Sequence, residues 1–545
     1  MTYEKDIPDF ALVPAKPPEE RMITPLTENS IHSTMQVTNM METAKTEILI
    51  EEDILVPDTR PDLKSILMMD GSLQINQREG EKSRAGSRSE TATISGEIAL
   101  STLYVPEKAD MNPIPIPIQN RISFQEPWNL LEGKEGNYCL EGKIEKLHYH
   151  VVNERKFRVK ILVGVEMREW KNLQVELFEG LQNETIEMRK EDVEVTGLAL
   201  RKKELFAVEE LFVVKEGEAY PESIIKQEIS IVDHQRQTAA EKMVINGSIG
   251  VNLLYLAEDG LHQLKEKIEF TQFIPLSRSG TWSGSRVAFD CSELKAKVST
   301  TEEGAGAILL EGELITWLEL YENEKRQVIV DCYHQEKDFL CDYEEIPCKR
   351  LVSTIHGETS MREIVTAEGE VEPEVLLFSK GEVTGCECRT EAGKVVVEGV
   401  LRSKILWRGS LSEGEEGLCS QEDSLPFRAV LNLPQISGHE KVSCQVCVKD
   451  FWAERLTGKQ MEVNATLFIT GEAVEKMPVK VLKNPAFEQG STMGEGKGMV
   501  VYVVKEGDDL WNIGKVFKAT RESMRQINQL GEEDLVVGRK LLIIK

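Results

Sequence analysis

The segment Ile245-Asn-Gly-Ser-Ile-Gly-Val-Asn-Leu-Leu-Tyr255 has two counterparts of the same length elsewhere in the chain. They are Ile94-Ser-Gly-Glu-Ile-Ala-Leu-Ser-Thr-Leu-Tyr104 and Val397-Glu-Gly-Val-Leu-Arg-Ser-Lys-Ile-Leu-Trp407. Each copy has a β-branched residue, a glycine two positions later, and an aromatic residue eight positions after the glycine. The three glycines, Gly96, Gly247 and Gly399, lie 151 and 152 residues apart. A spacing repeated so closely predicts three tandem copies of one domain.

The repeated segments are typical of half-buried β-strands, because Val, Ile, Leu and Thr alternate with polar residues between turn-forming ones. Further apolar runs follow at 159–170, 308–321 and 461–472. Glycine inside a strand usually marks a bulge or a close backbone approach, and we expect that role for the three glycines. The repeated aromatic is expected in the core. Short helices are possible at 62–69 and 221–228. The predicted fold class is mainly β.

A proline precedes the repeated glycine in each of the three copies. Pro221 and Pro373 each precede their glycine by 26 residues, and Pro61 precedes Gly96 by 35 residues. The extra residues in the first copy fit a polar insertion at 78–90, which we interpret as a longer hairpin loop.

These patterns divide the chain of 545 residues into segments. Composition shifts and turn-forming residues set the limits of the segments outside the repeats. We expect a flexible N-terminal segment (1–45), three β modules (46–200, 201–350 and 351–475), a linker (476–498) and a small C-terminal domain (499–545).

The chain is acidic, with 65 Lys and Arg against 93 Asp and Glu and a formal net charge of −28. That charge argues against nucleic acid as a partner, because phosphates are repelled across most of the surface. No apolar window approaches the ~20 residues that a membrane helix needs, and the first residues lack the pattern of a signal peptide. We expect an intracellular protein with reduced thiols and no membrane insertion.

The sequence gives only weak signals for metal ligands and catalytic groups. Cys386-x-Cys388 and Cys444-x-x-Cys447 supply two close pairs, the arrangement that zinc needs, but both lie in expected strands and buried thiols are the favoured interpretation. His148 and His150 share one strand face without a third ligand. No nucleophile elbow, P-loop or dinucleotide fingerprint is present. We expect no catalytic residue, no metal and no cofactor. The sequence does not exclude a catalytic pair of carboxylates within the modules, but it indicates no particular pair.

The last 47 residues change pattern. A short apolar strand at 499–504 precedes Asp509, which is placed to cap a helix with Leu510, Ile513 and Phe517 on one face. Thr520 is placed to cap a second helix, and 541–544 is the closing strand. This segment has eight basic and seven acidic residues. A near-neutral tip on an acidic body suits docking to an acidic protein or polymer.

Two resemblances to known families follow from these residues. Ile54-Leu-Val-Pro-Asp-Thr-Arg-Pro-Asp-Leu-Lys-Ser-Ile66, followed by the segment from Gly96 to Tyr104, resembles the SPOCS domain of spore-coat assembly proteins. The second and third copies carry weaker versions of this motif. Tyr502-Val-Val-Lys-Glu-Gly-Asp-Asp-Leu-Trp-Asn-Ile513, Ile527-Asn-Gln-Leu530 and Val537-Gly-Arg-Lys-Leu-Leu-Ile543 resemble the LysM domain.

The LysM resemblance implies a groove that grips N-acetylglucosamine polymers through backbone groups. Three features depart from the family: Asp509 stands where Thr or Ser is usual, Gly514 replaces a usual Ala, and Ile544-Lys545 lack the frequent closing proline. Trp511 has two interpretations, as a sugar-stacking residue or as a residue that packs on the fold. The groove residues that the resemblance implies are Gly507, Asp508, Asp509, Leu510 and Trp511 on one side, and Asn528, Gln529 and Leu530 on the other.

With both domains in one chain, the sequence resembles the SipL type of spore-coat morphogenetic protein. They imply a non-enzymatic adaptor at the forespore surface in the mother-cell cytoplasm. Its LysM domain would bind the basal-layer coat ATPase SpoIVA, and its β modules would form a scaffold that recruits other coat proteins or self-associates. The alternative is a cell-wall or cortex protein that binds peptidoglycan. An unrecognised glycan-modifying enzyme is a third interpretation.

Overall fold

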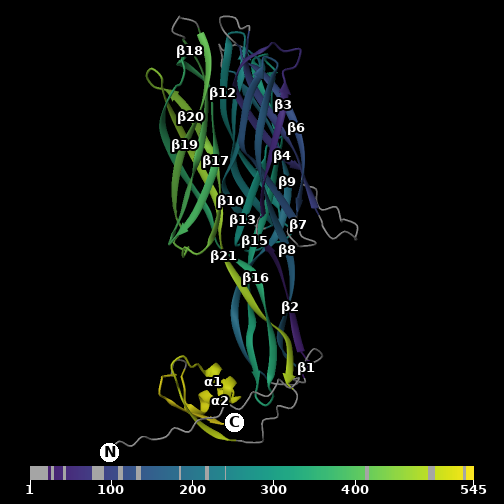
Figure 1. The fold of residues 1–545 in the computed structure, drawn as a ribbon, viewed down its shortest axis with the longest axis vertical. Coiled ribbons are helices and arrows are strands. Elements are labelled where there is room, and N and C mark those ends of the chain that lie inside the picture. The colour runs from purple at the N-terminus through teal and green to yellow at the C-terminus, as the bar shows by residue number, and fades with distance from the viewer. Residues whose placement is uncertain are drawn as a thin grey trace, which may run out of the picture.

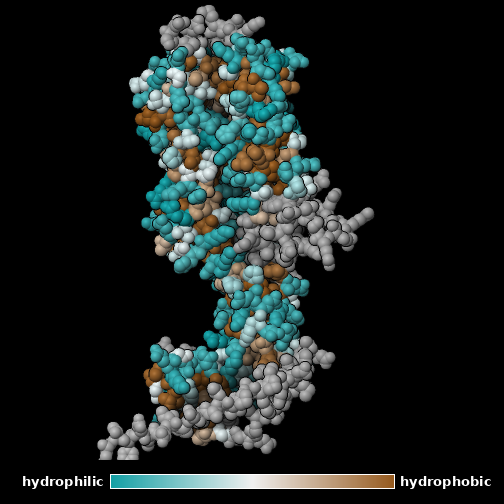
Figure 2. Space-filling view, in the orientation of Figure 1, coloured by the Kyte–Doolittle hydropathy of each residue, from teal (hydrophilic) through white to brown (hydrophobic). Residues whose placement is uncertain are grey.

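The computed structural model has a broad head, a narrower stalk below it, and a small domain beside the base of the stalk (Figure 1). The surface of the head is largely hydrophilic with scattered apolar patches (Figure 2). The structure describes residues 23–25, 30–40, 44–76, 91–107, 114–129, 137–182, 186–214, 220–239, 241–410, 416–488, 498–531 and 535–544.

Strands make up almost all of the described chain. Two strands precede the first module: β1 (Ile23–Pro25) and β2 (Ser30–Met40). The first module contains β3 (Ala44–Leu55), β4 (Leu63–Asn76), β5 (Thr91–Pro106), β6 (Ile116–Asn129), β7 (Asn137–Asn153) and β8 (Lys156–Leu181). The second contains β9 (Ile186–Val213), β10 (Pro221–Ala239), β11 (Lys242–Ala257), β12 (Gly260–Pro275), β13 (Gly284–Asp290), β14 (Lys295–Thr300) and β15 (Gly306–His334). The third contains β16 (Phe339–Thr366), β17 (Glu372–Glu391), β18 (Lys394–Ser410), β19 (Glu416–Asn432), β20 (Lys441–Arg455) and β21 (Gln460–Glu488).

Each module is a sandwich of two antiparallel sheets around its own apolar core. The inner sheets have the orders β4-β5-β6, β10-β11-β12 and β17-β18-β19. In each outer sheet the last strand of the module, β8, β15 or β21, pairs with the first strand, β3, β9 or β16. The same topology occurs three times, except that the short strands β13 and β14 of the second module stand in place of the single strand β7 or β20. The predicted mainly-β fold class and the three copies are confirmed.

The repeated glycines make room for an aromatic ring on the neighbouring strand. A Cβ atom on any of the three would lie 2.7 Å from a phenylalanine ring atom, closer than real Cβ contacts allow. The predicted close approach is therefore confirmed, and the repeated aromatic is buried in all three cores. The paired residues are Gly96 and Phe124, Gly247 and Phe270, and Gly399 and Phe427.

The prediction of two short helices, at 62–69 and 221–228, is wrong. Residues 62–69 lie largely in β4 and residues 221–228 lie in β10. Both segments pair with the central strand of an inner sheet, through registers interrupted by bulges. Pairing with the next strand of the chain, which local propensity does not report, decided their conformation.

The stalk was not predicted. It consists of β1, β2 and the lower parts of β8, β9, β15, β16 and β21, and these lower parts continue out of the head as paired ribbons (Figure 1). Its interior is apolar and includes Met35, Val37, Val175, Leu177, Val195, Val328, Ile346, Val479 and Val481.

The stalk corrects four predicted boundaries. Residues 30–40 and 44–45 are strand within the N-terminal segment predicted to be flexible, and 476–488 continue β21 where a linker was predicted. The limits predicted at 200 and 350 fall inside β9 and β16, because the chain passes between modules after Leu181 and after His334. Strand alternation has the same period in head and stalk, so the sequence pattern does not separate them. The insertion at 78–90 and the proline-rich residues 1–22 lie outside the described residues.

The three inner sheets surround a common axis. In ring order β6 lies beside β10, β12 beside β17, and β19 beside β4. An apolar layer on this axis takes residues from every module: Met68, Leu103, Ile225, Leu254, Leu377, Phe378 and Leu406.

A buried charged cluster lies next to that apolar layer. Asp70 of the first module is paired with Lys226 of the second and with Lys380 (3.2 Å) and Lys404 (3.0 Å) of the third. Lys380 also pairs with Glu228 at 3.0 Å. Burial alone would raise the pKa of the Asp70 carboxyl, but the charges of the three lysines outweigh burial and hold that pKa well below its usual value.

We predict that Asp70→Asn lowers the free energy of unfolding by about 3–5 kcal/mol, because it leaves buried ammonium groups without their shared carboxylate. Urea denaturation followed by circular dichroism measures the change. Asp58→Asn is the matched control, since the Asp58 side chain is fully exposed. Equal effects of the two substitutions would contradict the role given to Asp70.

Candidate functional site

The C-terminal domain has the predicted order of strand, helix, helix and strand. It consists of β22 (Met499–Val503), α1 (Leu510–Phe517), α2 (Arg521–Asn528) and β23 (Lys540–Ile544), with β22 and β23 paired antiparallel. Its core contains Val504, Ile513, Ala519, Met524, Leu541 and Ile543. The predicted fold of this segment is confirmed.

Both predicted helix caps are present. The Asp509 carboxylate accepts from the backbone N–H of Asn512 (2.6 Å), and the Thr520 hydroxyl accepts from that of Ser523 (3.1 Å). Asp509 therefore has a folding role as well as its implied place in the groove. Replacing such a cap by alanine costs roughly 1 kcal/mol, whereas serine keeps the interaction.

Asp508 organises the turn before α1. Its carboxylate accepts from the backbone N–H of Lys505 and from the Tyr502 hydroxyl, both at 2.7 Å. These hydrogen bonds, that from Lys505 first, hold the pKa of Asp508 below its usual value. Asp508 therefore stabilises this turn, in addition to its implied place in the groove.

Asn528 joins the end of α2 to the closing strand. Its amide donates to the carbonyl of Leu542 (2.8 Å) and its side-chain oxygen accepts from the Leu542 N–H (2.6 Å). Both hydrogen-bonding ends of the side chain are thus occupied within the domain. The next residue, Gln529, has a left-handed backbone that ends the helix, and its side chain is exposed.

Trp511 does not present its ring to solvent. The residue is 4% exposed, and its indole N–H donates to the Asp331 carboxylate at the base of the stalk (2.8 Å). The ring meets Tyr333 edge to face with centroids 5.0 Å apart. Of the two interpretations of Trp511, packing fits this geometry. Sequence reasoning missed Asp331 and Tyr333, because nothing local connects residues 180 positions apart.

The remaining groove residues lie on both sides of one small core. Leu510 from the start of α1 and Leu530 from the end of α2 pack on it together. Gly507 is exposed and has a backbone φ of +85°, which favours glycine there. The groove therefore offers backbone groups around Gly507 and the exposed Gln529 side chain, while Asp508, Asn528 and Trp511 are committed to folding or packing.

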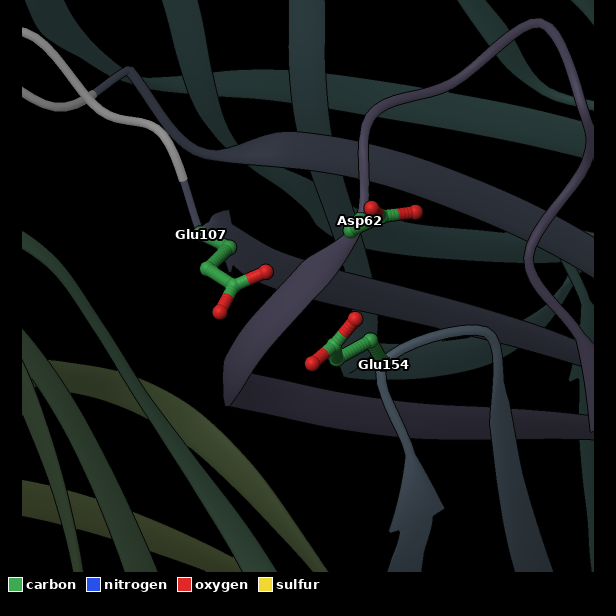
Figure 3. Close-up of side chains that lie close together, drawn as sticks. All are labelled: Asp62, Glu107 and Glu154. Carbon is green, nitrogen blue, oxygen red and sulfur yellow. The ribbon is translucent and has the colours of Figure 1, made fainter.

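Three exposed carboxylates lie close together at the far end of the first module. Asp62, Glu107 and Glu154 come from the start of β4, the end of β5 and the turn between β7 and β8 (Figure 3). Their oxygens lie within 4.8 Å of one another. Arg155 pairs with Asp62 at 3.1 Å and also donates to backbone carbonyls of the loop Val56–Asp62. The carboxylates belong to the turns that close this module, and exposed acidic groups commonly cluster without an ion.

The cysteine candidates lie on β17 and β20 of the third module, and the histidine candidates lie on β7 of the first. Cys386, Cys388 and Cys444 pack on the third core, and a hydrogen bond with the Cys444 thiol lowers the pKa of Cys388. Cys447 is exposed, where a buried thiol was expected. His148 and His150 are both exposed, opposite Lys160 and Arg158.

Comparison with family models finds two domains in the chain. The SipL, SPOCS domain matches residues 221–301, and the LysM domain matches residues 502–543. This is the domain combination of the SipL type. The SPOCS match lies in the second module, whereas the motif in the sequence is clearest in the first. Searches of curated proteins and of solved structures gave no match.

These matches identify the kinds of domain that the chain contains. It carries a domain of sporulation proteins together with a module of the peptidoglycan-binding type, and both are binding domains without catalytic chemistry of their own. Among the described residues, neither helix is long and apolar enough to cross a membrane.

We predict that Ile513→Ala destabilises the C-terminal domain by about 2–5 kcal/mol, because Ile513 is 3% exposed in its core. Val516→Ala in the same helix is the matched control, since Val516 is 71% exposed. Amide hydrogen exchange of peptides from β22, α2 and β23 in the full chain measures the loss. Similar exchange in the two variants would show that the assigned core is wrong.

Proposed function

We propose that this protein is a non-enzymatic morphogenetic adaptor of the spore coat. In this role the LysM domain binds the basal-layer ATPase SpoIVA, and the three β modules form a scaffold that holds other coat proteins or further copies of the chain. It acts in the mother-cell cytoplasm at the forespore surface. The observation that carries the proposal is the pairing of a SipL SPOCS domain with a LysM domain in one chain.

The architecture supports an adaptor rather than an enzyme. The three modules share a buried axis, so the head is a single body, and the stalk separates it from the LysM domain. Two binding surfaces fixed on one scaffold engage two partners at once, and each partner is held at a high effective concentration for the other. This type of assembly needs no catalytic group.

The properties of the groove favour a protein ligand over a glycan. Trp511, the aromatic residue among the implied groove residues, is covered by the stalk and offers no stacking surface. The Asp509 carboxylate, which stands where the family usually has a hydroxyl, caps α1 and lies 3.6 Å from Arg189 of the stalk, so it is already engaged within the chain. Peptidoglycan binding is nevertheless the second candidate, because the LysM match itself points to glycan recognition.

We predict that the full-length chain captures purified SpoIVA and that Gln529→Gly weakens capture by about tenfold or more, as expected for loss of an interface side chain. Glycine keeps the left-handed backbone at this position, so the fold is retained. Gln526→Ala is the matched control, because Gln526 is exposed on α2 outside the groove. Surface plasmon resonance gives both dissociation constants.

The same proteins are mixed with purified peptidoglycan and sedimented. Sedimentation that Gln529→Gly abolishes, together with no capture of SpoIVA, would replace the adaptor proposal by the glycan-binding alternative. Binding to neither ligand would refute both.

A further inference from the structure

The LysM domain meets the stalk through a charged face that is separate from Gln529 and Leu530. The face is the corner between α1 and α2, and it lies on β9, β15 and the turn after β15. Among the described residues, three ion pairs join a basic LysM residue to an acidic stalk residue, and a fourth joins them with the signs reversed. They are Lys515 with Asp331 (2.7 Å), Lys518 with Asp338 (2.5 Å), Arg521 with Glu187 (3.6 Å) and, with reversed sign, Asp509 with Arg189 (3.6 Å).

Asp331 is the centre of this contact. Its carboxylate accepts the indole N–H of Trp511, and both of its oxygens contact the Lys515 ammonium, at 2.7 and 2.9 Å. Burial alone would raise the pKa of Asp331, but the hydrogen bonds from Lys515 and Trp511 bring it below its usual value. A single stalk carboxylate thus holds one aromatic and one cationic group of the same helix.

The two surfaces also fit in shape. The Tyr333 hydroxyl donates to the carbonyl of Ala519 (2.8 Å) in the turn between α1 and α2. The same hydroxyl lies 2.5 Å from the position that a Cβ on Gly514 would occupy. Any residue larger than glycine at 514 would press against Tyr333. Two of the departures of this LysM domain from its family, Asp509 and Gly514, therefore face the stalk.

We propose that the LysM domain is docked on the base of its own stalk and that Asp331 is the positioning residue that fixes the direction of the groove. The basic residues that suit an acidic partner are occupied by the acidic stalk of the same chain. Residues 489–498 join β21 to β22, so the two surfaces are held together at an effective concentration on the order of millimolar. Any partner bound in the groove is then presented in one orientation relative to the head.

The test is a double-mutant cycle in the full chain, read by amide hydrogen exchange. Asp331→Ala and Lys515→Met should each speed exchange in α1 and in the lower end of β15 by about tenfold or more, because these amides lose the docked state. The double variant should exchange about as fast as Asp331→Ala alone, because both substitutions remove the same interaction. Lys325→Met is the matched control: it makes the same change on β15, at an 80% exposed lysine that faces Glu194.

Unchanged exchange in either single variant would overturn the proposal, and so would additive effects in the double variant. Amides of β23 should stay protected throughout, because Leu541 and Ile543 lie in the core of the LysM domain itself. An equal rise in β23 would mean that the domain unfolds rather than undocks, which also overturns a positioning role. The experiment uses no ligand, so its failure is distinct from failure of the adaptor proposal.

Discussion

One carboxylate on the central axis, Asp70, is shared by ammonium groups from the two other modules, and the arrangement of the head depends on it. Taking charges out of water is costly unless each one is paired, so the modules cannot separate or slide along the axis without leaving buried charges unpaired. Apolar contacts alone would tolerate several registers between three similar sheets. The charged cluster differs at equivalent positions of the repeat, with Asp70, Glu228 and Lys380, and so specifies one arrangement.

The stalk follows from the head. Each module closes with a strand that is too long for its sandwich, and the excess leaves the head paired with another long strand. Backbone N–H and C=O groups stay satisfied along these ribbons, and the apolar side chains that face inward bury one another. An elongated support therefore forms without a further domain, and it carries the C-terminal domain at its far end.

In the LysM domain, most of the implied groove residues either stabilise the fold of the domain or contact the stalk. Asp508, Asp509 and Asn528 stabilise turns and helix ends, while Trp511 and Gly514 face the stalk. What is left for an external ligand is mostly backbone and one exposed amide. A groove of this kind takes its specificity from shape and orientation, which is consistent with a domain whose direction is fixed by the body that carries it.

The sequence by itself determined the three β modules, the close contacts at Gly96, Gly247 and Gly399, and both helix caps of the LysM domain, because each depends on local periodicity and neighbouring residues. Tertiary structure alone decided the stalk, the common axis and the covering of Trp511. These features join residues more than 100 and up to more than 300 positions apart, such as Lys226 with Asp70 and Lys404 with Asp70. Strand alternation reports which face of a strand is apolar, but it does not report which distant surface covers that face.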